Sequence, residues 1–121
     1  MTTTMNTRRA APADDVKEPA PARGAAYLTI VRFSGDPDRL LDEYRKHSEV
    51  MSAVGRDHRL ILHAGAKTDS GFLVVNLWPS SWDSEAAAQD PRRLGVLERT
   101  EIKPDQIRRE HHQVANYVVL R

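Results

Sequence analysis

The sequence predicts one α+β domain, built on a four-stranded antiparallel sheet with helices packed on one face. Two observations predict it. Segments rich in β-branched and aromatic residues alternate with segments that begin on helix-capping residues and carry apolar residues at helical spacing. The predicted order of these segments is strand, helix, strand, strand, helix, strand. A chain of 121 residues suffices for one domain of this kind and not for two.

The N-terminal residues 1–25 differ in composition from the rest. They are rich in Thr, Ala and Pro and contain little that could join a core, so we expect a disordered tail before a folded domain over 26–121. The pair Arg8-Arg9 is followed by a polar stretch instead of the apolar segment of an export signal. We therefore expect a cytoplasmic protein.

The overall composition excludes several classes of function. The 18 basic residues nearly balance the 17 acidic ones, so no broad positive field favours nucleic acid or an anionic membrane. No cysteine is present, which excludes disulfides, thiolate nucleophiles and cysteine-rich zinc sites. No apolar run approaches the roughly 20 residues of a membrane helix. We expect neither a nucleic-acid partner nor a membrane partner.

The first two elements are a strand and a long helix. Tyr27–Phe33 is dense in β-branched and aromatic residues and predicts the strand. Asp36 and Pro37 suit the cap and the first position of a helix, and Gly55 is predicted to end it. The predicted inward stripe of this helix contains Leu40, Leu41, Tyr44, Ser48 and Met51.

A hairpin follows the helix. Leu60–Ala66 and Gly71–Trp78 are the predicted strands, joined by a four-residue turn, and Pro79 ends the second of them. This turn length places Ala66 opposite Gly71 and therefore His63 opposite Val74.

The remaining elements are short. Ser80 or Ser81 is predicted to cap a helix that runs to about Gln89, and Asp90-Pro91 to begin another that runs to about Arg99. The last predicted strand is Gln113–Leu120. The resulting βαββαβ order is the split layout of ferredoxin-like domains.

The third strand is apolar on both faces. Its two alternating sets are Leu73, Val75 and Leu77 on one face, and Phe72, Val74, Asn76 and Trp78 on the other. A strand that is apolar on both sides must be buried on both sides. Helices can cover one face, so the other predicts a homodimer that packs sheet against sheet.

The βαββαβ order and the segment VVNLWPSSWDSEAAA together resemble the dimeric α/β-barrel superfamily, and within it the antibiotic-biosynthesis monooxygenase-like group. In that group the third strand commonly ends in a tryptophan, followed by a serine and a Glu/Ala-rich helix, as Trp78, Ser80 and residues 85–88 do here. The resemblance covers residues 26–120 and implies a dimeric α/β barrel with a cleft between sheet and helices. The superfamily includes cofactor-free oxygenases, haem-degrading enzymes and isomerases, so the resemblance fixes the fold and not the reaction.

The resemblance does not extend to the haem-degrading members. Those proteins carry a histidine on the helix after the tryptophan, where this chain has Ala88, Gln89 and Asp90. They also carry an asparagine in the first strand, where this chain has Tyr27 and Thr29. We therefore predict no cofactor.

The candidate site lies on one face of the hairpin. Paired residues share a face, so His63 lies on the side of Asn76 and Trp78. We predict that His63 takes a proton and that Asn76 donates to a developing oxyanion, with purely structural hydrogen bonding as the alternative for both. The predicted substrate-binding residues around them are Trp78, Tyr44, His47, Phe72, Val74 and Met51.

Two basic clusters are candidates for further sites. His111-His112 suggests a metal, but neighbouring residues of a strand face opposite sides, so no metal site is predicted. Arg92-Arg93 with Arg108-Arg109 suggests a basic rim for an acidic substrate, and a solvated face is the alternative.

The predicted function is that of a small homodimeric enzyme acting on an aromatic or polyketide-like small molecule, with cofactor-independent monooxygenation as the specific reaction considered. In that reaction an electron-rich phenol loses a proton and the resulting anion reacts with oxygen directly. One alternative is a non-catalytic small-molecule-binding or accessory dimer of the same fold. Another is an interaction module whose N-terminal tail recruits a larger partner.

Overall fold

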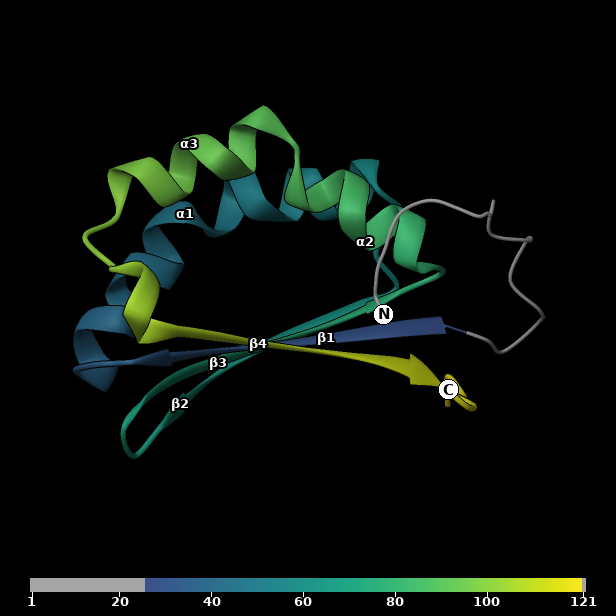
Figure 1. The fold of residues 1–121 in the computed structure, drawn as a ribbon, viewed down its shortest axis with the longest axis horizontal. Helices are drawn as coiled ribbons and strands as arrows, with labels where there is room; N and C mark the ends of the chain where they lie inside the picture. The colour runs from purple at the N-terminus through teal and green to yellow at the C-terminus, as the bar shows by residue number, and fades with distance from the viewer. Residues whose placement is uncertain (1–25, 121) are drawn as a thin grey trace.

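The computed structural model describes residues 26–120 and confirms the predicted fold class. The strands form one antiparallel sheet in the order β2-β3-β1-β4, and Figure 1 shows the helices gathered over one face of it. The elements in chain order are β1 (Ala26–Ser34), α1 (Pro37–Asp57), β2 (Leu62–Thr68), β3 (Gly71–Trp78), α2 (Ser81–Ala88), α3 (Pro91–Arg99), a 3₁₀ turn (Pro104–Gln106) and β4 (Ile107–Val114).

The predicted tail, residues 1–25, lies outside the described residues. Over the part that the structure describes, no helix combines the length and the apolar character needed to span a bilayer.

The three helices begin where the sequence predicts. Each has a polar cap whose side chain accepts a hydrogen bond from a backbone N–H of the first turn: Asp36 at 3.1 Å, Ser80 at 3.2 Å and Asp90 at 2.9 Å. Such a cap stabilises a helix by about 1 kcal/mol. Ser80, and not Ser81, is the cap of α2.

The prediction that Gly55 ends α1 is wrong, because the helix continues to Asp57. A glycine inside a helix costs only about 1 kcal/mol, which tertiary packing readily offsets. The glycine serves a close contact instead: a Cβ on Gly55 would lie 2.7 Å from Cδ2 of Leu60. The chain then reverses through Arg59, whose φ of 68° lies in the left-handed region.

The predicted hairpin register is off by two residues. The strands extend to a two-residue turn at 69–70, so that Thr68 pairs with Gly71 and His63 pairs with Asn76 instead of Val74. Two-residue turns suit the twist of a hairpin, which explains the longer strands. A shift of two residues keeps every side chain on its predicted face.

The prediction of the last strand at Gln113–Leu120 is also wrong. The strand is β4, and it pairs with β1 from Ala26↔Val114 to Phe33↔Ile107. The chain after Val114 has passed the beginning of β1 and has no strand beside it in the described protomer. The sequence IRREHHQV is polar because β4 is an edge strand, where charged residues are common.

The core lies between the sheet and the helices. Val54 of α1, Trp78 of β3 and Ala87 of α2 form its buried centre, with Tyr27 and Leu60 packed against it. None of the helices described between residues 26 and 120 lies over the opposite sheet face (Figure 1). Its apolar side chains are Leu28, Ile30, Leu62, Leu73, Val75 and Leu77.

Candidate active site

A cavity of about 250 Å³ lies between the sheet and the helices, and its walls are mainly apolar. All eight residues that the sequence predicts for the site line it. They are Tyr44, His47, Met51, His63, Phe72, Val74, Asn76 and Trp78.

A polar row crosses the floor of the cavity from one sheet edge to the other. His63 of β2 pairs with Asn76 of β3, Asn76 pairs with Thr29 of β1, and Thr29 pairs with His111 of β4. Directly paired residues share a face, so all four side chains line the cavity. The sequence had placed His63 and Asn76 as diagonal neighbours, whereas the register makes them directly opposite.

A chain of two short hydrogen bonds joins the polar residues at the β2 edge. The His63 Nδ1 atom lies 2.6 Å from Asn76 Oδ1, and the His63 Nε2 atom lies 2.5 Å from the Tyr44 hydroxyl oxygen. The rings of Tyr44 and His63 are nearly parallel, at 9°. His63 is exposed at the rim of the cavity, because β2 is an edge strand.

The amide oxygen fixes the direction of one of these hydrogen bonds, and the protonation of the ring sets that of the other. An amide oxygen only accepts, so Nδ1 of His63 carries the proton that it donates to Asn76. When the ring is neutral, its Nε2 is an acceptor and accepts from the Tyr44 O–H. The arrangement is that of a base oriented by a third group.

The surroundings of Tyr44 keep its hydroxyl protonated and in place. Burial raises the pKa of Tyr44 above its usual value, so at neutral pH the phenol remains a donor. The ring packs on Phe72, with 4.8 Å between centroids. It also lies directly over Gly65, where a Cβ would come within 2.7 Å of the Tyr44 Cζ atom.

Trp78 forms the buried end of the cavity. Only 5% of it is exposed, and its indole N–H donates to Thr29 Oγ1 at 3.3 Å. This hydrogen bond satisfies the polar atom of a buried indole and fixes the ring plane. Trp78 is therefore a rigid wall.

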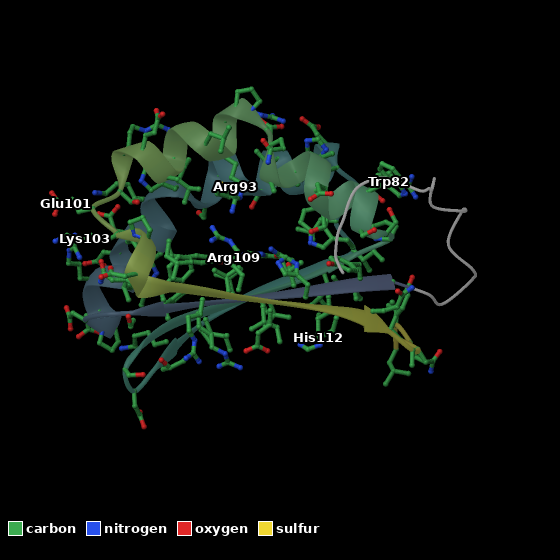
Figure 2. All side chains as sticks on the ribbon, in the orientation of Figure 1. Trp82, Arg93, Glu101, Lys103, Arg109 and His112 are labelled. Atoms are coloured by element: carbon green, nitrogen blue, oxygen red, sulfur yellow. The ribbon has the colours of Figure 1, made fainter. Side chains whose placement is uncertain are left out.

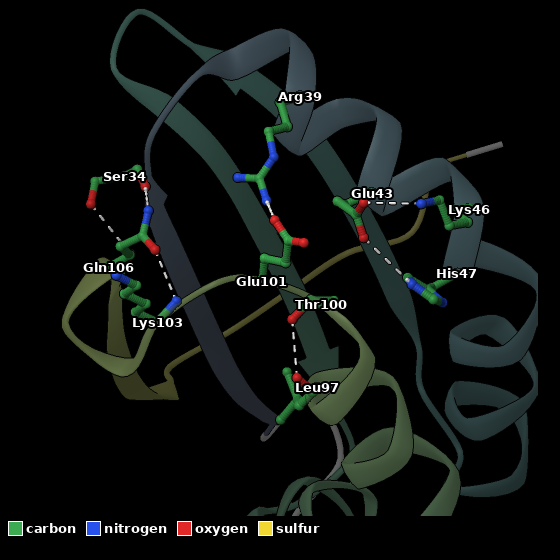
Figure 3. Close-up of polar contacts among 10 residues, drawn as sticks. All are labelled: Ser34, Arg39, Glu43, Lys46, His47, Leu97, Thr100, Glu101, Lys103 and Gln106. Carbon is green, nitrogen blue, oxygen red and sulfur yellow. Dashed lines mark hydrogen bonds and ion pairs between the residues drawn. The ribbon is translucent and has the colours of Figure 1, made fainter.

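His47 is held by an acid of its own helix. Its Nε2 lies 3.6 Å from Glu43 Oε1, and Lys46 pairs with the other oxygen of the same carboxylate at 3.1 Å (Figure 3). The side chains of His47 and Glu43 are 14% and 18% exposed, so both form part of the cavity wall. The charge of Glu43 is therefore balanced by Lys46.

The cavity is also lined by Thr29, Arg93, Arg109 and His111, which the sequence did not place beside the predicted site residues. The sequence indicated Arg93 and Arg109 only as part of a basic rim for an acidic substrate. Arg109 and His111 of β4 were hidden by the misplaced strand, since alternate residues of β4 share the cavity face only once β4 begins at Ile107. His112 lies on the opposite face (Figure 2), 3.4 Å from Glu110. Within residues 26–120, no three His, Cys, Asp or Glu side chains gather as a metal site.

No protein-family model matches the chain, and no curated protein matches it significantly. Solved structures do match. SnoaB, a cofactor-independent oxygenase from Streptomyces nogalater, has a TM-score of 0.52 at 12% identity, with 79% of this chain and 95% of SnoaB covered. A point mutant of SnoaB has the same TM-score at 13% identity, with 82% and 98% covered.

Two further structures match to a similar degree. A dimeric ferredoxin-like protein from an uncultured marine organism has a TM-score of 0.53 at 12% identity, covering 81% of this chain and 93% of its own. A Bacteroides thetaiotaomicron protein of unknown function, described as a possible oxidoreductase, has a TM-score of 0.51 at 7% identity, with 76% and 97% covered. At such identities the likeness concerns the fold alone. At that level it agrees with the ferredoxin-like βαββαβ fold that the sequence predicts.

Proposed function

We propose that the cavity binds a planar aromatic small molecule and removes a proton from it, as the first step of a cofactor-independent oxygenation. The observation that carries this proposal is the hydrogen-bonded chain from Asn76 through His63 to Tyr44 at the rim of an apolar cavity. The fold that the chain shares with SnoaB, itself a cofactor-independent oxygenase, adds support.

The hydrogen bonds give the proton a path. As a substrate phenol or acidic C–H gives its proton to the Tyr44 oxygen, Tyr44 passes its own proton to Nε2 of His63. The imidazolium that forms is stabilised by the Asn76 oxygen on Nδ1. Because His63 lies at the rim, the proton can leave to water.

The cavity walls suit a flat, electron-rich ligand. Phe72, Val74, Met51 and Trp78 provide apolar surface on which aromatic rings pack favourably. The amide nitrogen of Asn76 donates to no other described residue, and it faces the cavity beside His63. It is therefore placed to donate to the oxygen on which negative charge develops.

The oxygen step needs no protein-bound group. With anthrone as the probe, loss of a methylene proton gives a carbanion-like anion whose carbon bonds to dioxygen. The resulting peroxide takes up a proton and then loses water, so that anthrone and one dioxygen give anthraquinone and one water.

The proposal includes a homodimer. The sheet face opposite the helices is apolar over three strands, and Leu62 on it is 52% exposed. A second copy packed on this face buries it, and one of the structurally similar proteins is described as dimeric.

Oxygen uptake with anthrone tests the proposal. We expect the wild type to accelerate anthraquinone formation over the spontaneous rate, and His63→Gln to lower kcat about 100-fold or more, the usual contribution of a positioned base. His112→Gln is the matched control, because His112 lies on the other sheet face. No acceleration by the wild type, or full activity in His63→Gln, would contradict the proposal.

A second candidate function is non-catalytic binding in the same cavity. It is favoured by the fact that Tyr44 already occupies the one free acceptor of His63, as in a purely structural hydrogen bond. In that case anthrone binds, oxygen uptake stays at the spontaneous rate, and Tyr44→Phe changes affinity alone.

A further inference from the structure

The β4 end of the cavity is basic. Arg93 extends from α3 and Arg109 from β4, and Figure 2 shows both side chains in the space between the helices and the sheet. His111 lines the same end, two residues after Arg109 on the same face of β4. These three side chains are the basic end of the cavity.

Among the described residues, no carboxylate pairs with the two arginines of the basic end. The ion pairs formed within residues 26–120 include neither Arg93 nor Arg109, whereas Arg32, Arg39 and Arg92 on the outer surface each pair with a carboxylate. Glu85 of α2 is the acid whose charge acts on His111.

The charge of Arg109 acts on the other two groups of the basic end. Burial, and then the charge of Arg109, lowers the pKa of Arg93. Burial and the same guanidinium lower the pKa of His111, so its ring is neutral at neutral pH. Two positive charges in a partly desolvated cavity repel each other, and this repulsion destabilises the protein without a ligand. An anion bound between the two guanidinium groups would offset the repulsion.

We propose that the basic end of the cavity binds a carboxylate carried by the planar ligand, with Arg93 and Arg109 as its hydrogen-bond donors. The identity of the ligand body as a planar aromatic rests on the proposed function above. Arg93 is already oriented, since its Nη1 donates to the carbonyl oxygen of Ala88 at 3.0 Å and leaves its other N–H groups for the ligand. Guanidinium groups suit this role because their planar fork matches a carboxylate.

The position of the basic end sets the length of the ligand. His63 lies on β2 and Arg109 on β4, the two edges of the sheet. Strands lie about 4.8 Å apart, so three intervals separate these edges by about 14 Å. A ligand that meets the Tyr44–His63 pair at one end and the arginines at the other is therefore an extended fused-ring acid and not a single-ring one.

Binding of anthracene-2-carboxylate, followed by its own fluorescence, tests this inference. The neutral isostere anthracene-2-methanol shows what the aromatic body contributes alone. We expect the wild type to bind the carboxylate more tightly, and Arg93→Gln and Arg109→Gln each to weaken it about tenfold or more, or about 1.4 kcal/mol. Binding of the alcohol should hardly change in either variant.

Arg108→Gln is the matched control, because it removes the same charge from the same strand on the opposite face. If a variant does not fold, a salt series on the wild type still tests the inference. We expect the affinity for the carboxylate to fall with added sodium chloride and the affinity for the alcohol to stay constant. Equal wild-type affinity for the two probes, or an equal loss in Arg108→Gln, would overturn the inference.

These binding results are separate from those that test the proposed function. If carboxylate binding depends on the arginines but anthrone causes no oxygen uptake, the results support carboxylate binding at the basic end and contradict the proposed oxygenation. Oxygen uptake from anthrone without any preference for the carboxylate supports the oxygenase and overturns the basic end.

Discussion

Tyr44, His63 and Asn76 show how far single residues can be placed from the sequence. Strand parity was enough to put His63 and Asn76 on one face, because parity survives a register shift of two. It was not enough to show that they hydrogen-bond, which depends on the true register. The contact of Tyr44 with His63 depends on Gly65, and no pattern in the sequence indicates that a helix side chain lies over that glycine.

Gly65→Ala tests the geometry of the pair without removing either partner. The new Cβ would lie 2.7 Å from Tyr44 Cζ and 2.9 Å from its hydroxyl oxygen, so the phenol must move away from His63. We expect oxygen uptake to fall to the level of Tyr44→Phe, and the free energy of unfolding to fall by about 1–3 kcal/mol from overpacking. Activity assays and urea denaturation measure both effects.

Gly95→Ala is the control for this change. Gly95 lies in α3, and the nearest atom to a Cβ there is the flexible end of Arg99 at 3.3 Å. We expect this variant to be more stable by about 0.5–1 kcal/mol, as for an ordinary helical glycine, with unchanged activity. Equal activity in Gly65→Ala and the wild type would show that the Tyr44–His63 contact is not needed.

At the scale of elements, helix starts were predictable and the polar edge strand was not. Caps are local signals, and all three were found. The start of β4 depends in addition on a distant contact: Gln106 donates to the Ser34 carbonyl oxygen at 2.9 Å, while it accepts from the nearby Lys103 backbone N–H at 2.8 Å (Figure 3). The apolar residues 117–120 misled the prediction because hydrophobicity marks burial or an interface, not strand pairing.

Asp90, between α2 and α3, caps α3 and also contacts the residue that ends α1. Asp90, 9% exposed, accepts from the Arg92 side chain at 2.7 and 3.0 Å and lies 3.0 Å from Nε2 of His58, which follows α1. Hydrogen bonds from Arg92, and then from His58, hold the pKa of Asp90 far below its usual value. The sequence indicated the cap but not the contact with His58.

Asp90→Ala therefore has a pH-dependent effect on stability. The folded-state pKa is depressed, so the stabilisation is present above the unfolded value of about 3.9 and is lost as pH falls toward the folded value. We expect the variant to melt below the wild type at pH 7, with a gap that narrows steadily below pH 4. Thermal melts by circular dichroism measure this gap.

Asp42→Ala, which removes an exposed acid from α1, is the comparison for that series. A gap for Asp90→Ala that stays constant from pH 7 to pH 2.5 would mean that ionisation of Asp90 does not contribute.

In the whole molecule, the two faces of the sheet have different roles. One face carries the cavity, and the other is an apolar surface that the proposed dimer covers. The fold and the need for cover on both faces followed from the alternation in β3. The position of positive charge inside the cavity could not be predicted from that alternation, because it depends on Arg93 of α3 and Arg109 of β4, which face the same cavity only in the folded chain.

Val75→Glu tests the dimer. Val75 pairs with Ile30 and Ala64 at the centre of the uncovered face, so a charge there opposes sheet-to-sheet packing. By light scattering we expect the wild type at twice the 13.6 kDa chain mass and the variant near the single mass. A monomeric wild type at micromolar concentration would contradict the dimer.

The proposed chemistry requires that this cavity take a proton from a planar aromatic ligand through Tyr44 and His63. The most direct measurement is hydrogen–deuterium exchange of the anthrone methylene group, followed by proton NMR in deuterium oxide without oxygen, which isolates proton transfer from oxidation. We predict that the wild type accelerates the exchange and that His63→Gln returns it to the rate in buffer. Equal exchange rates with the wild type, with His63→Gln and with buffer alone would contradict the claim.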